Sequence, residues 1–262
     1  MEKNSNIDFY DGLATSYHLI FHDWERSAAW QGEFFNQFIR SRLSHEEGGA
    51  IKLLDASCGI GTQALGLAQH DFLVTATDLS PKSVERAARE AERLGVQLHL
   101  GIADFRTLGQ DVPGRFEVVL SADNAIPHLL TDEDLHQACC QLYSKLEDNG
   151  LLILSIRDYD QEIIMKQRAT EPRVMDGGKR IAFQVWDWNE CGNIYTTNQF
   201  ILQETDGHWE THVSKTDYRA LLRAELSEAL NGAGFKNIQW HMPSESGYYQ
   251  PIVTAGKLGE QE

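Results

Sequence analysis

The stretch that decides the fold is LLDASCGIGTQALGLA, residues 53–68. An apolar run ends there at Asp55, and small residues follow it before a helical pattern begins. Gly59 and Gly61 carry no Cβ, so the chain can turn sharply and a ligand can touch its backbone. A helix that starts directly after the turn offers free N–H groups. The stretch therefore predicts a ligand-binding loop between a strand and a helix.

Short apolar runs alternate with amphipathic stretches around this loop. Runs rich in Leu, Val and Ile predict strands at 51–55, 72–78, 97–103, 116–122 and 150–156. Helices are expected between them at 62–69, 80–95 and 131–148. Alternation of this kind predicts an α/β fold with a doubly wound, mostly parallel sheet and helices on both of its faces.

The pattern changes after residue 157. Three segments, at 179–190, 193–204 and 208–216, read as antiparallel strands joined by turns. We interpret them as a small antiparallel sheet inserted after the fifth strand. A helix at 218–234 and strands at 235–240 and 248–257 then complete a seven-stranded main sheet.

This organisation predicts three parts. Residues 1–45, which are rich in aromatic side chains, form an N-terminal helical cap. Residues 46–157 and 217–262 form the α/β domain, and residues 158–216 form an inserted antiparallel lid.

Composition narrows the class of protein. The chain has 262 residues, 42% of them hydrophobic and 24% charged, which is typical of a globular protein. A net charge of −16 without a basic patch argues against nucleic acid as a partner. The longest apolar run is too short to span a membrane, and no secretory signal is visible. The four cysteines lack metal-ligand spacing, so we expect a cytoplasmic protein without a metal. Strands in the insertion leave homo-oligomerisation open.

Acidic residues stand at the ends of the first three expected strands. The carboxyl ends of parallel strands share one edge of the sheet, where ligands bind. Asp78 is placed to accept both hydroxyls of a ribose, and Asp104 to accept from an adenine amine with Phe105 packed on the ring. Asp55 beside the glycine loop favours a positively charged tail. The ordered set describes a nucleoside with a cationic tail, which is S-adenosylmethionine.

A dinucleotide is the rival ligand. The spacing of Gly59, Gly61 and Ala64 also satisfies the fingerprint GxGxxA of dinucleotide-binding folds. The pyrophosphate of such a ligand is anionic and sits on the loop and the helix N-terminus. Asp55 would be a poor neighbour for it, which disfavours a nicotinamide-dependent oxidoreductase. For any one acid taken alone, capping of a turn remains an equal alternative.

Residues 51–157 resemble the class I S-adenosylmethionine-dependent methyltransferases. LLDASCGIG resembles the first motif of that family, with Ser57 where a glycine is usual. The resemblance is closest to the glycine N-methyltransferase branch with the bacterial glycine/sarcosine methyltransferases. It implies a Rossmann-like methyltransferase fold and S-adenosyl-L-methionine as the cofactor. The expected cofactor contacts are Tyr10, Tyr17, Arg26, Asp55, Ser57, Gly59, Gly61, Asp78, Leu79, Asp104, Phe105 and Ala122.

The resemblance also implies an acceptor site after the fourth and fifth strands. In SADNAIPHLL and SIRDYD, it places Arg157 on the carboxylate of an amino acid and Asn124 near the acceptor amine. His128 completes the predicted catalytic set. Asp123 departs from the pattern, because the glycine enzymes have glycine there. The expected function is methylation of a small molecule, such as the carboxylate-bearing amines glycine or sarcosine. An O-methyltransferase and a non-catalytic cofactor-binding protein are the alternatives.

Several of these residues have a structural alternative. Arg157 could form an ion pair with Asp160. His128 is better read as a hydrogen-bonded residue at the rim than as a general base. Trp186 and Trp188 share one face of a strand, where they either line the acceptor pocket or pack the lid onto the main sheet.

Overall fold

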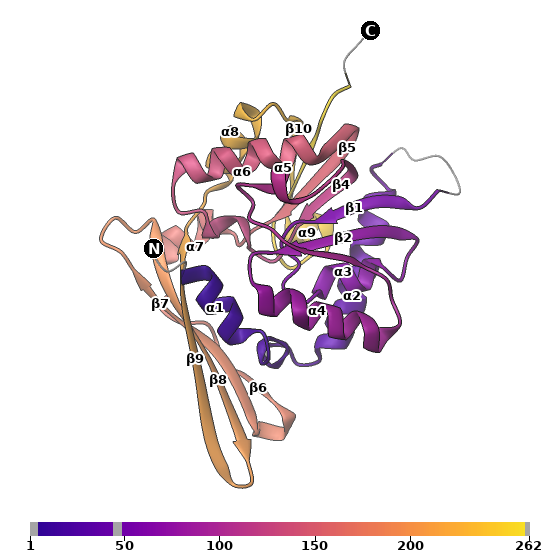
Figure 1. Ribbon diagram of the computed structural model, residues 1–262. Helices are drawn as coiled ribbons and strands as arrows, with labels where there is room; N and C mark the ends of the chain where they lie inside the picture. The colour runs from indigo at the N-terminus through magenta and orange to yellow at the C-terminus, as the bar shows by residue number, and fades with distance from the viewer. Residues whose placement is uncertain (1–4, 44–48, 260–262) are drawn as a thin grey trace.

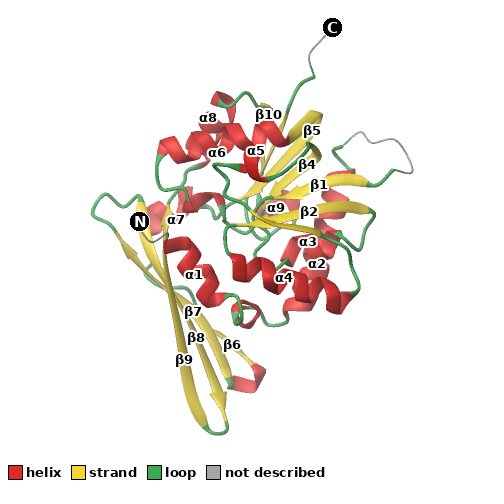
Figure 2. Ribbon diagram, viewed as in Figure 1, coloured by secondary structure: helices red, strands yellow, loops and turns green. Residues whose placement is uncertain are grey.

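The computed structural model describes residues 5–43 and 49–259, which form two sheets (Figures 1 and 2). The larger sheet has seven strands in the order β10-β11-β5-β4-β1-β2-β3, and the smaller has four in the order β6-β7-β8-β9. The predicted boundary at 45/46 between cap and domain lies outside the described residues. No helix in the described ranges is both long and apolar enough to cross a membrane.

The larger sheet has the predicted topology. Strands β1 to β5 run parallel, whereas β11 lies antiparallel beside β5 and is followed by β10. The doubly wound, mostly parallel, seven-stranded sheet is therefore confirmed. Its strands are β1 (Ile51–Asp55), β2 (Phe72–Asp78), β3 (His99–Ile102), β4 (Phe116–Ser121), β5 (Leu146–Ser155), β10 (Lys236–His241) and β11 (Ile252–Gly256).

Helices cover both faces of this sheet (Figure 1). On β5, Leu152 and Leu154 join the core beneath α5, α6 and α8, whereas Ile153 joins the core beneath α2 and α3. Successive side chains of a strand point to opposite faces, so the strand must be apolar throughout. The helices are α2 (Trp24–Arg40), α3 (Thr62–Leu67), α4 (Pro81–Leu94), α5 (Leu108–Asp111), α6 (Asp132–Lys145) and α8 (Arg223–Gly232).

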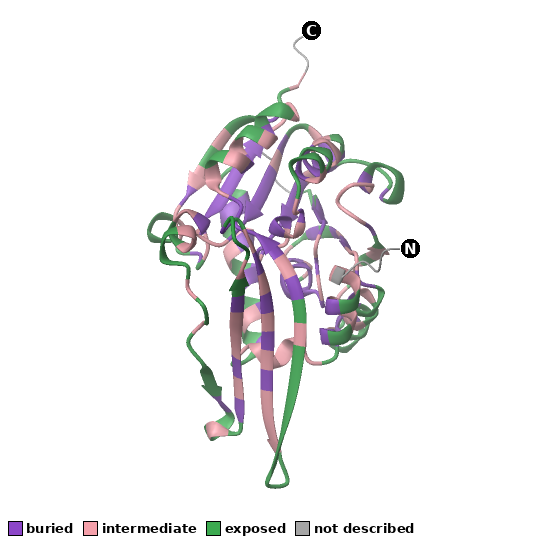
Figure 3. Cartoon of the chain, turned by 90° about the vertical axis from the view of Figure 1, so that its left-hand side faces the viewer, coloured by how far each residue is buried: buried purple, intermediate pink, exposed green. Residues whose placement is uncertain are grey.

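The smaller sheet lies between α7 (Tyr159–Met165) and α8 in the chain. It consists of β6 (Arg173–Met175), β7 (Arg180–Trp188), β8 (Ile194–Thr205) and β9 (His208–Arg219). Helix α1 (Ser5–Leu13) lies beside β9, and Ile201 of β8 packs on its Phe9 and Leu13. The turn between β8 and β9 extends away from the rest of the chain and is exposed (Figure 3). The inserted antiparallel sheet is confirmed, whereas the division into three domains stays a prediction.

Three predicted elements differ from the structure. The helix expected at 131–148 ends at Lys145, because Leu146 already pairs with Phe116 as part of β5. The helix expected at 218–234 begins only at Arg223, because Tyr218 belongs to β9 and pairs there with Tyr195 of β8. The last strand is shorter than 248–257, since its first residues form a loop after α9 (Pro243–Ser246). Short helical turns η1 (Tyr17–Ile20), η2 (Ile126–His128) and η3 (Asp176–Gly178) complete the fold.

Helices α2 and α3 touch backbone to backbone beneath the glycine loop. A Cβ on Gly66 would overlap the carbonyl oxygen of Ala28 and the Cα of Gly32. The contact holds α3, and with it the loop, against the N-terminal part of the chain.

We expect Gly66→Ala to lower the free energy of unfolding by roughly 1–3 kcal/mol, because the added methyl group forces the two helices apart. Chemical denaturation monitored by circular dichroism measures this. Gly12→Ala in α1 is the matched control, since no atom lies within 4 Å of the position of its added Cβ. Equal stability of Gly66→Ala and the native protein would contradict the close packing of α2 on α3.

Candidate cofactor and acceptor sites

Two adjoining cavities lie at the carboxyl ends of the parallel strands. The larger has a volume of about 810 Å³ and the smaller about 340 Å³. Both volumes fall in the range of small-molecule sites. Tyr10, Tyr17 and Asp123 line both cavities, so the two cavities are neighbours that share this part of their walls.

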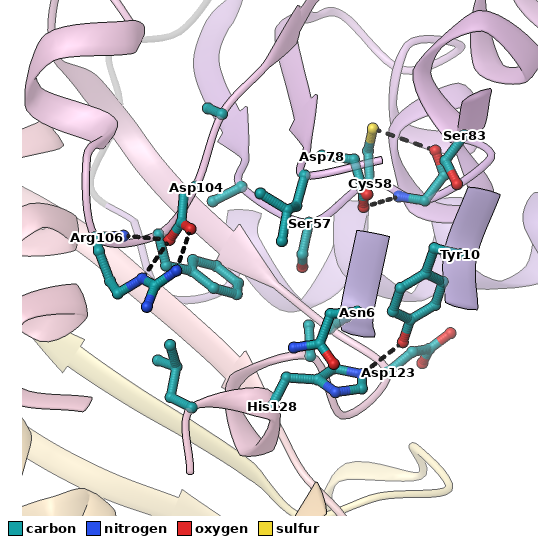
Figure 4. Close-up of a pocket in the computed structure, with 18 of the residues that line it drawn as sticks. Asn6, Tyr10, Ser57, Cys58, Asp78, Ser83, Asp104, Arg106, Asp123 and His128 are labelled. Atoms are coloured by element: carbon teal, nitrogen blue, oxygen red, sulfur yellow. Dashed lines mark hydrogen bonds and ion pairs between the residues drawn. The ribbon is translucent and has the colours of Figure 1, made fainter. Parts of the chain in front are cut away.

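Most of the predicted cofactor residues line the larger cavity. These are Tyr10, Tyr17, Ser57, Gly59, Asp78, Leu79, Asp104, Phe105 and Ala122. Figure 4 shows Ser57 and Asp78 on one side of it, and Tyr10 with His128 on the other. Three predicted residues do not line it. Gly61 and Asp55 lie behind the wall, and Arg26 is exposed on α2.

The glycine loop is tied to the end of β2. The N–H of Gly59 donates to Oδ2 of Asp78 at 2.8 Å, and the N–H of Ser80 donates to Oδ1 at 2.9 Å. Gly59 and Gly61 have φ of +53° and +96°, a region that favours glycine. A Cβ on Gly61 would also lie 2.8 Å from Cδ1 of Leu65. The bare backbone at this turn is therefore a steric requirement of the loop.

Asp55 is fully buried beneath this loop. Its Oδ1 accepts from the N–H of Ser57 at 3.3 Å, but its Oδ2 has no partner. Burial, with smaller contributions from the charges of Asp78 and Asp123, raises the pKa of Asp55 to about 7. An unpaired buried carboxylate oxygen fits a cationic group in the larger cavity and does not fit a phosphate.

Asp104, in contrast to Asp55, forms an ion pair with an arginine. Arg106 donates to it in a bidentate pair, with Nη2 to Oδ2 at 2.7 Å and Nε to Oδ1 at 3.0 Å. Burial opposes ionisation of Asp104, but the hydrogen bonds from Arg106 outweigh it and lower the pKa. Asp104 and Phe105 lie at the same end of the larger cavity, where an adenine amine would meet an ionised acceptor.

Arg157 lines the smaller cavity without an ion-pair partner among the described residues. Its Nη1 donates to the Tyr195 hydroxyl at 3.2 Å and its Nη2 to Oε1 of Gln184 at 2.8 Å. The guanidinium lies 4.8 Å from the ring centroid of Trp186. Asp160, the acid considered as its partner, instead pairs with Arg223 at 3.4 Å. Within the described ranges no carboxylate forms an ion pair with Arg157, so its charge is available to an anionic ligand.

The side chain of Asn124 holds the backbone of Arg157 in place. It has φ of +72°, and its Oδ1 accepts from the N–H of Arg157 at 3.0 Å. Its Nδ2 donates to the Tyr159 hydroxyl at 2.8 Å. Asn124 also lines the smaller cavity, where the acceptor is expected. Its side chain therefore lies at the predicted site and also holds the backbone of Arg157 in position.

His128 is a neutral hydrogen-bonded residue at the rim of the larger cavity. Its Nδ1 lies 3.1 Å from the carbonyl oxygen of Asp217, which accepts only, so Nδ1 carries the proton. Its Nε2 therefore accepts from the Tyr10 hydroxyl at 2.7 Å. Burial is the main cause that lowers the pKa of His128 to about 4. The pair fastens α1 across the cavity.

Sequence reasoning did not find the partners of Asp123. The Tyr248 hydroxyl donates to its Oδ1 at 2.6 Å, and the Tyr249 hydroxyl donates to the same oxygen. Gln63 donates to Oδ2 at 2.8 Å. The adjacent tyrosines at 248 and 249 were the only signal, and they were expected in a strand.

The two tryptophans of β7 pack the smaller sheet onto the main one. Trp186 is buried in the core beneath α6, and Trp188 packs against that core. Neither lines the smaller cavity. Trp186 still bears on the site, because Arg157 rests on its ring.

Comparison with known proteins agrees with this geometry. Residues 53–150 match a family described as "Methyltransferase domain". The chain superposes on the S-adenosylmethionine-dependent methyltransferase from Clostridium acetobutylicum ATCC 824 with a TM-score of 0.74 at 14% identity, covering 98% of this chain and 100% of that one. It superposes on DesVI from Streptomyces venezuelae with a TM-score of 0.72 at 18% identity, covering 97% and 99%. Residues 53–150 therefore resemble a methyltransferase domain, and the superpositions show that the whole chain has the fold of these proteins.

Among curated proteins, the chain is similar to glycine/sarcosine N-methyltransferases, the branch that its sequence motifs resemble. It is 34% identical over 173 residues to the glycine/sarcosine N-methyltransferase of Parasynechococcus marenigrum (strain WH8102). The match covers 66% of this chain and 53% of that relative. The chain thus spans about half the length of the curated relatives that it matches.

We expect Asp55→Asn to stabilise the ligand-free protein and to weaken cofactor binding. The raised pKa of Asp55 contributes stability at acid pH that is lost as the pH rises through about 7. At pH 8 the amide should therefore be more stable, by up to about 4 kcal/mol. Thermal unfolding at pH 4 and pH 8 measures this difference.

The same variant should bind S-adenosylhomocysteine at least about tenfold more weakly, since it lacks the buried charge behind the wall that would attract the cationic tail. Calorimetric titration measures the affinity. Asn in place of Asp keeps the acceptor for the N–H of Ser57, so the loop itself is preserved. Unchanged affinity together with unchanged pH dependence would contradict the role of Asp55.

Proposed function

We propose that this protein is an S-adenosylmethionine-dependent N-methyltransferase of a small carboxylate-bearing amine. The observation that carries the proposal is the pair of cavities joined at Asp123. The larger has the acids that suit a cationic nucleoside, and the smaller presents the unpaired guanidinium of Arg157. Relatives named for glycine and sarcosine methylation support this acceptor class.

The larger cavity would hold the cofactor through this chain's own polar groups. Asp78 would accept from the ribose hydroxyls and Asp104 from the adenine amine, and Asp55 behind the wall would attract the cationic tail. When bound, the cofactor would supply a methyl group on a positive sulfur. The lone pair of an amine attacks the methyl carbon, the bond from carbon to sulfur breaks, and a neutral thioether leaves. The protein contributes position and the exclusion of water, which supply several kcal/mol of such a barrier.

The smaller cavity would orient the acceptor. Arg157 can bind a carboxylate through two parallel hydrogen bonds, and its backbone is held by Asn124. The amine then points to the junction lined by Tyr10, Tyr17 and Asp123, where the two cavities meet. Methylation of oxygen is less favoured, because the relatives are named for methylation of nitrogen.

The experiment is a transfer assay with S-adenosylmethionine and a panel of amino acids that includes glycine and sarcosine. We expect at least one amino acid to gain the mass of one methylene group, with equimolar formation of S-adenosylhomocysteine. Mass spectrometry of both products measures this. Turnover of carboxylic acids or alcohols in place of amino acids would contradict the proposal.

Arg157→Lys should raise the KM for the amino acid by about tenfold or more, because a lysine cannot reproduce the bidentate pair. Binding of S-adenosylhomocysteine should be unchanged. Arg223→Lys is the matched control, since Arg223 pairs with Asp158 and Asp160 and lines neither cavity. Equal effects of the two substitutions on the KM would remove Arg157 from the acceptor site.

A further inference from the structure

Asp123 is a half-buried carboxylate without a cationic partner among the described residues. Its oxygens accept from three neutral donors, the hydroxyls of Tyr248 and Tyr249 and the side-chain amide of Gln63. None of the ion pairs within the described ranges includes it. Neutral donors satisfy the hydrogen-bonding capacity of a carboxylate but leave its charge without a counter-ion.

The position of Asp123 makes that charge available to a ligand. It lines both cavities, and it immediately precedes Asn124, whose side chain holds the backbone of Arg157. The smaller cavity therefore carries an anion at its junction with the larger one and the cation Arg157 elsewhere on its wall. The two side chains do not pair with each other. A cavity with separated charges of opposite sign is complementary to a zwitterion.

We propose that Asp123 recognises the ammonium group of the acceptor, so that the smaller cavity selects the zwitterion of an amino acid by both of its charges. The inference rests on the proposed function and deepens it. Asp123 is then a specificity-determining residue, which excludes carboxylic acids that lack an ammonium group. Before methyl transfer the ammonium group must give one proton to the Asp123 carboxylate beside it, which frees the lone pair of the nitrogen for attack on the methyl group.

The backbone at Asp123 is compatible with aspartate. Its φ is +59°, in the left-handed region where Asp and Asn are enriched among non-glycine residues, and Asp71, Asp176 and Asp206 also have positive φ. What distinguishes Asp123 is its set of three donors and its place in the walls of both cavities, which the backbone conformation does not require.

The size of the smaller cavity bears on which zwitterion it takes. At about 340 Å³ it is much larger than a glycine molecule, and Phe9, Leu13, Phe21 and Phe183 contribute apolar side chains to its wall. They share the wall with polar side chains such as Gln184 and Gln199, so an acceptor larger than glycine fits with either an apolar or a polar side chain. The probes should therefore range from glycine to a bulky amino acid.

The test compares amino acids with the same acids lacking the ammonium group. The probes are glycine with acetate, alanine with propionate, and phenylalanine with 3-phenylpropionate, each titrated calorimetrically into protein saturated with S-adenosylhomocysteine. We expect at least one amino acid to bind tenfold or more tightly than its partner. In Asp123→Asn this preference should fall at least tenfold. Asparagine tolerates the left-handed backbone and keeps an acceptor for the tyrosines.

The control is Asp160→Asn, which removes a carboxylate that lines neither cavity and should leave the preference unchanged. Asp123→Gly provides a second variant that removes the charge and also relaxes the backbone. The affinity for S-adenosylhomocysteine is measured in parallel and should change less than threefold in both Asp123 variants.

Two outcomes would overturn the proposal while the methyltransferase function stands. In one, the native protein binds S-adenosylhomocysteine but no amino acid more tightly than its partner. In the other, the Asp123 variants keep the preference and lose S-adenosylhomocysteine affinity, which assigns Asp123 to the cofactor. If the native protein does not bind S-adenosylhomocysteine, the proposed function itself fails and the inference fails with it.

Discussion

The central constraint on this structure is a group of carboxylates at the larger cavity that have no cation among the described residues as an ion-pair partner. Asp78 and Asp123 line the larger cavity and Asp55 lies buried behind its wall, and no ion pair within the described ranges includes any of them. Burial and the charge of its neighbours raise the pKa of Asp55. Burial is also the main cause of the raised pKa of Asp78. A cationic ligand removes this penalty on binding, so the same charges that weaken the empty protein select its ligand.

The fold explains why these acids meet. Parallel strands β1, β2 and β4 end side by side, and each delivers one acid to the same edge. The close contact of α2 with α3 fixes the glycine loop, and α1 spans the cavity through the hydrogen bond between Tyr10 and His128. The smaller sheet adds the floor beneath Arg157, which rests on Trp186 of β7.

Features that depend on neighbouring residues, such as where a helix begins and ends, could be predicted from the sequence. The helix α4 begins after Ser80, whose side chain accepts from the N–H of Ser83, and it ends at Gly95 with φ of +67°, as its capping residues indicate. Contacts between segments that are far apart in the sequence could not be predicted in this way. Tyr248 reaches Asp123 only because the loop before β11 lies against the end of β4. Arg26 was expected at the cofactor from resemblance alone, and the structure leaves it exposed on α2.

The most direct test of the account is a calorimetric titration of the purified protein with S-adenosylmethionine, S-adenosylhomocysteine and NAD. The account predicts that the first two bind and that NAD does not, because the cavity offers carboxylates to the ligand. Asp78→Ala should abolish the binding, since Asp78 both faces the ribose and holds Gly59. Binding of NAD alone would contradict the account at its centre, because it would mean that the acids at the strand ends do not select a cation.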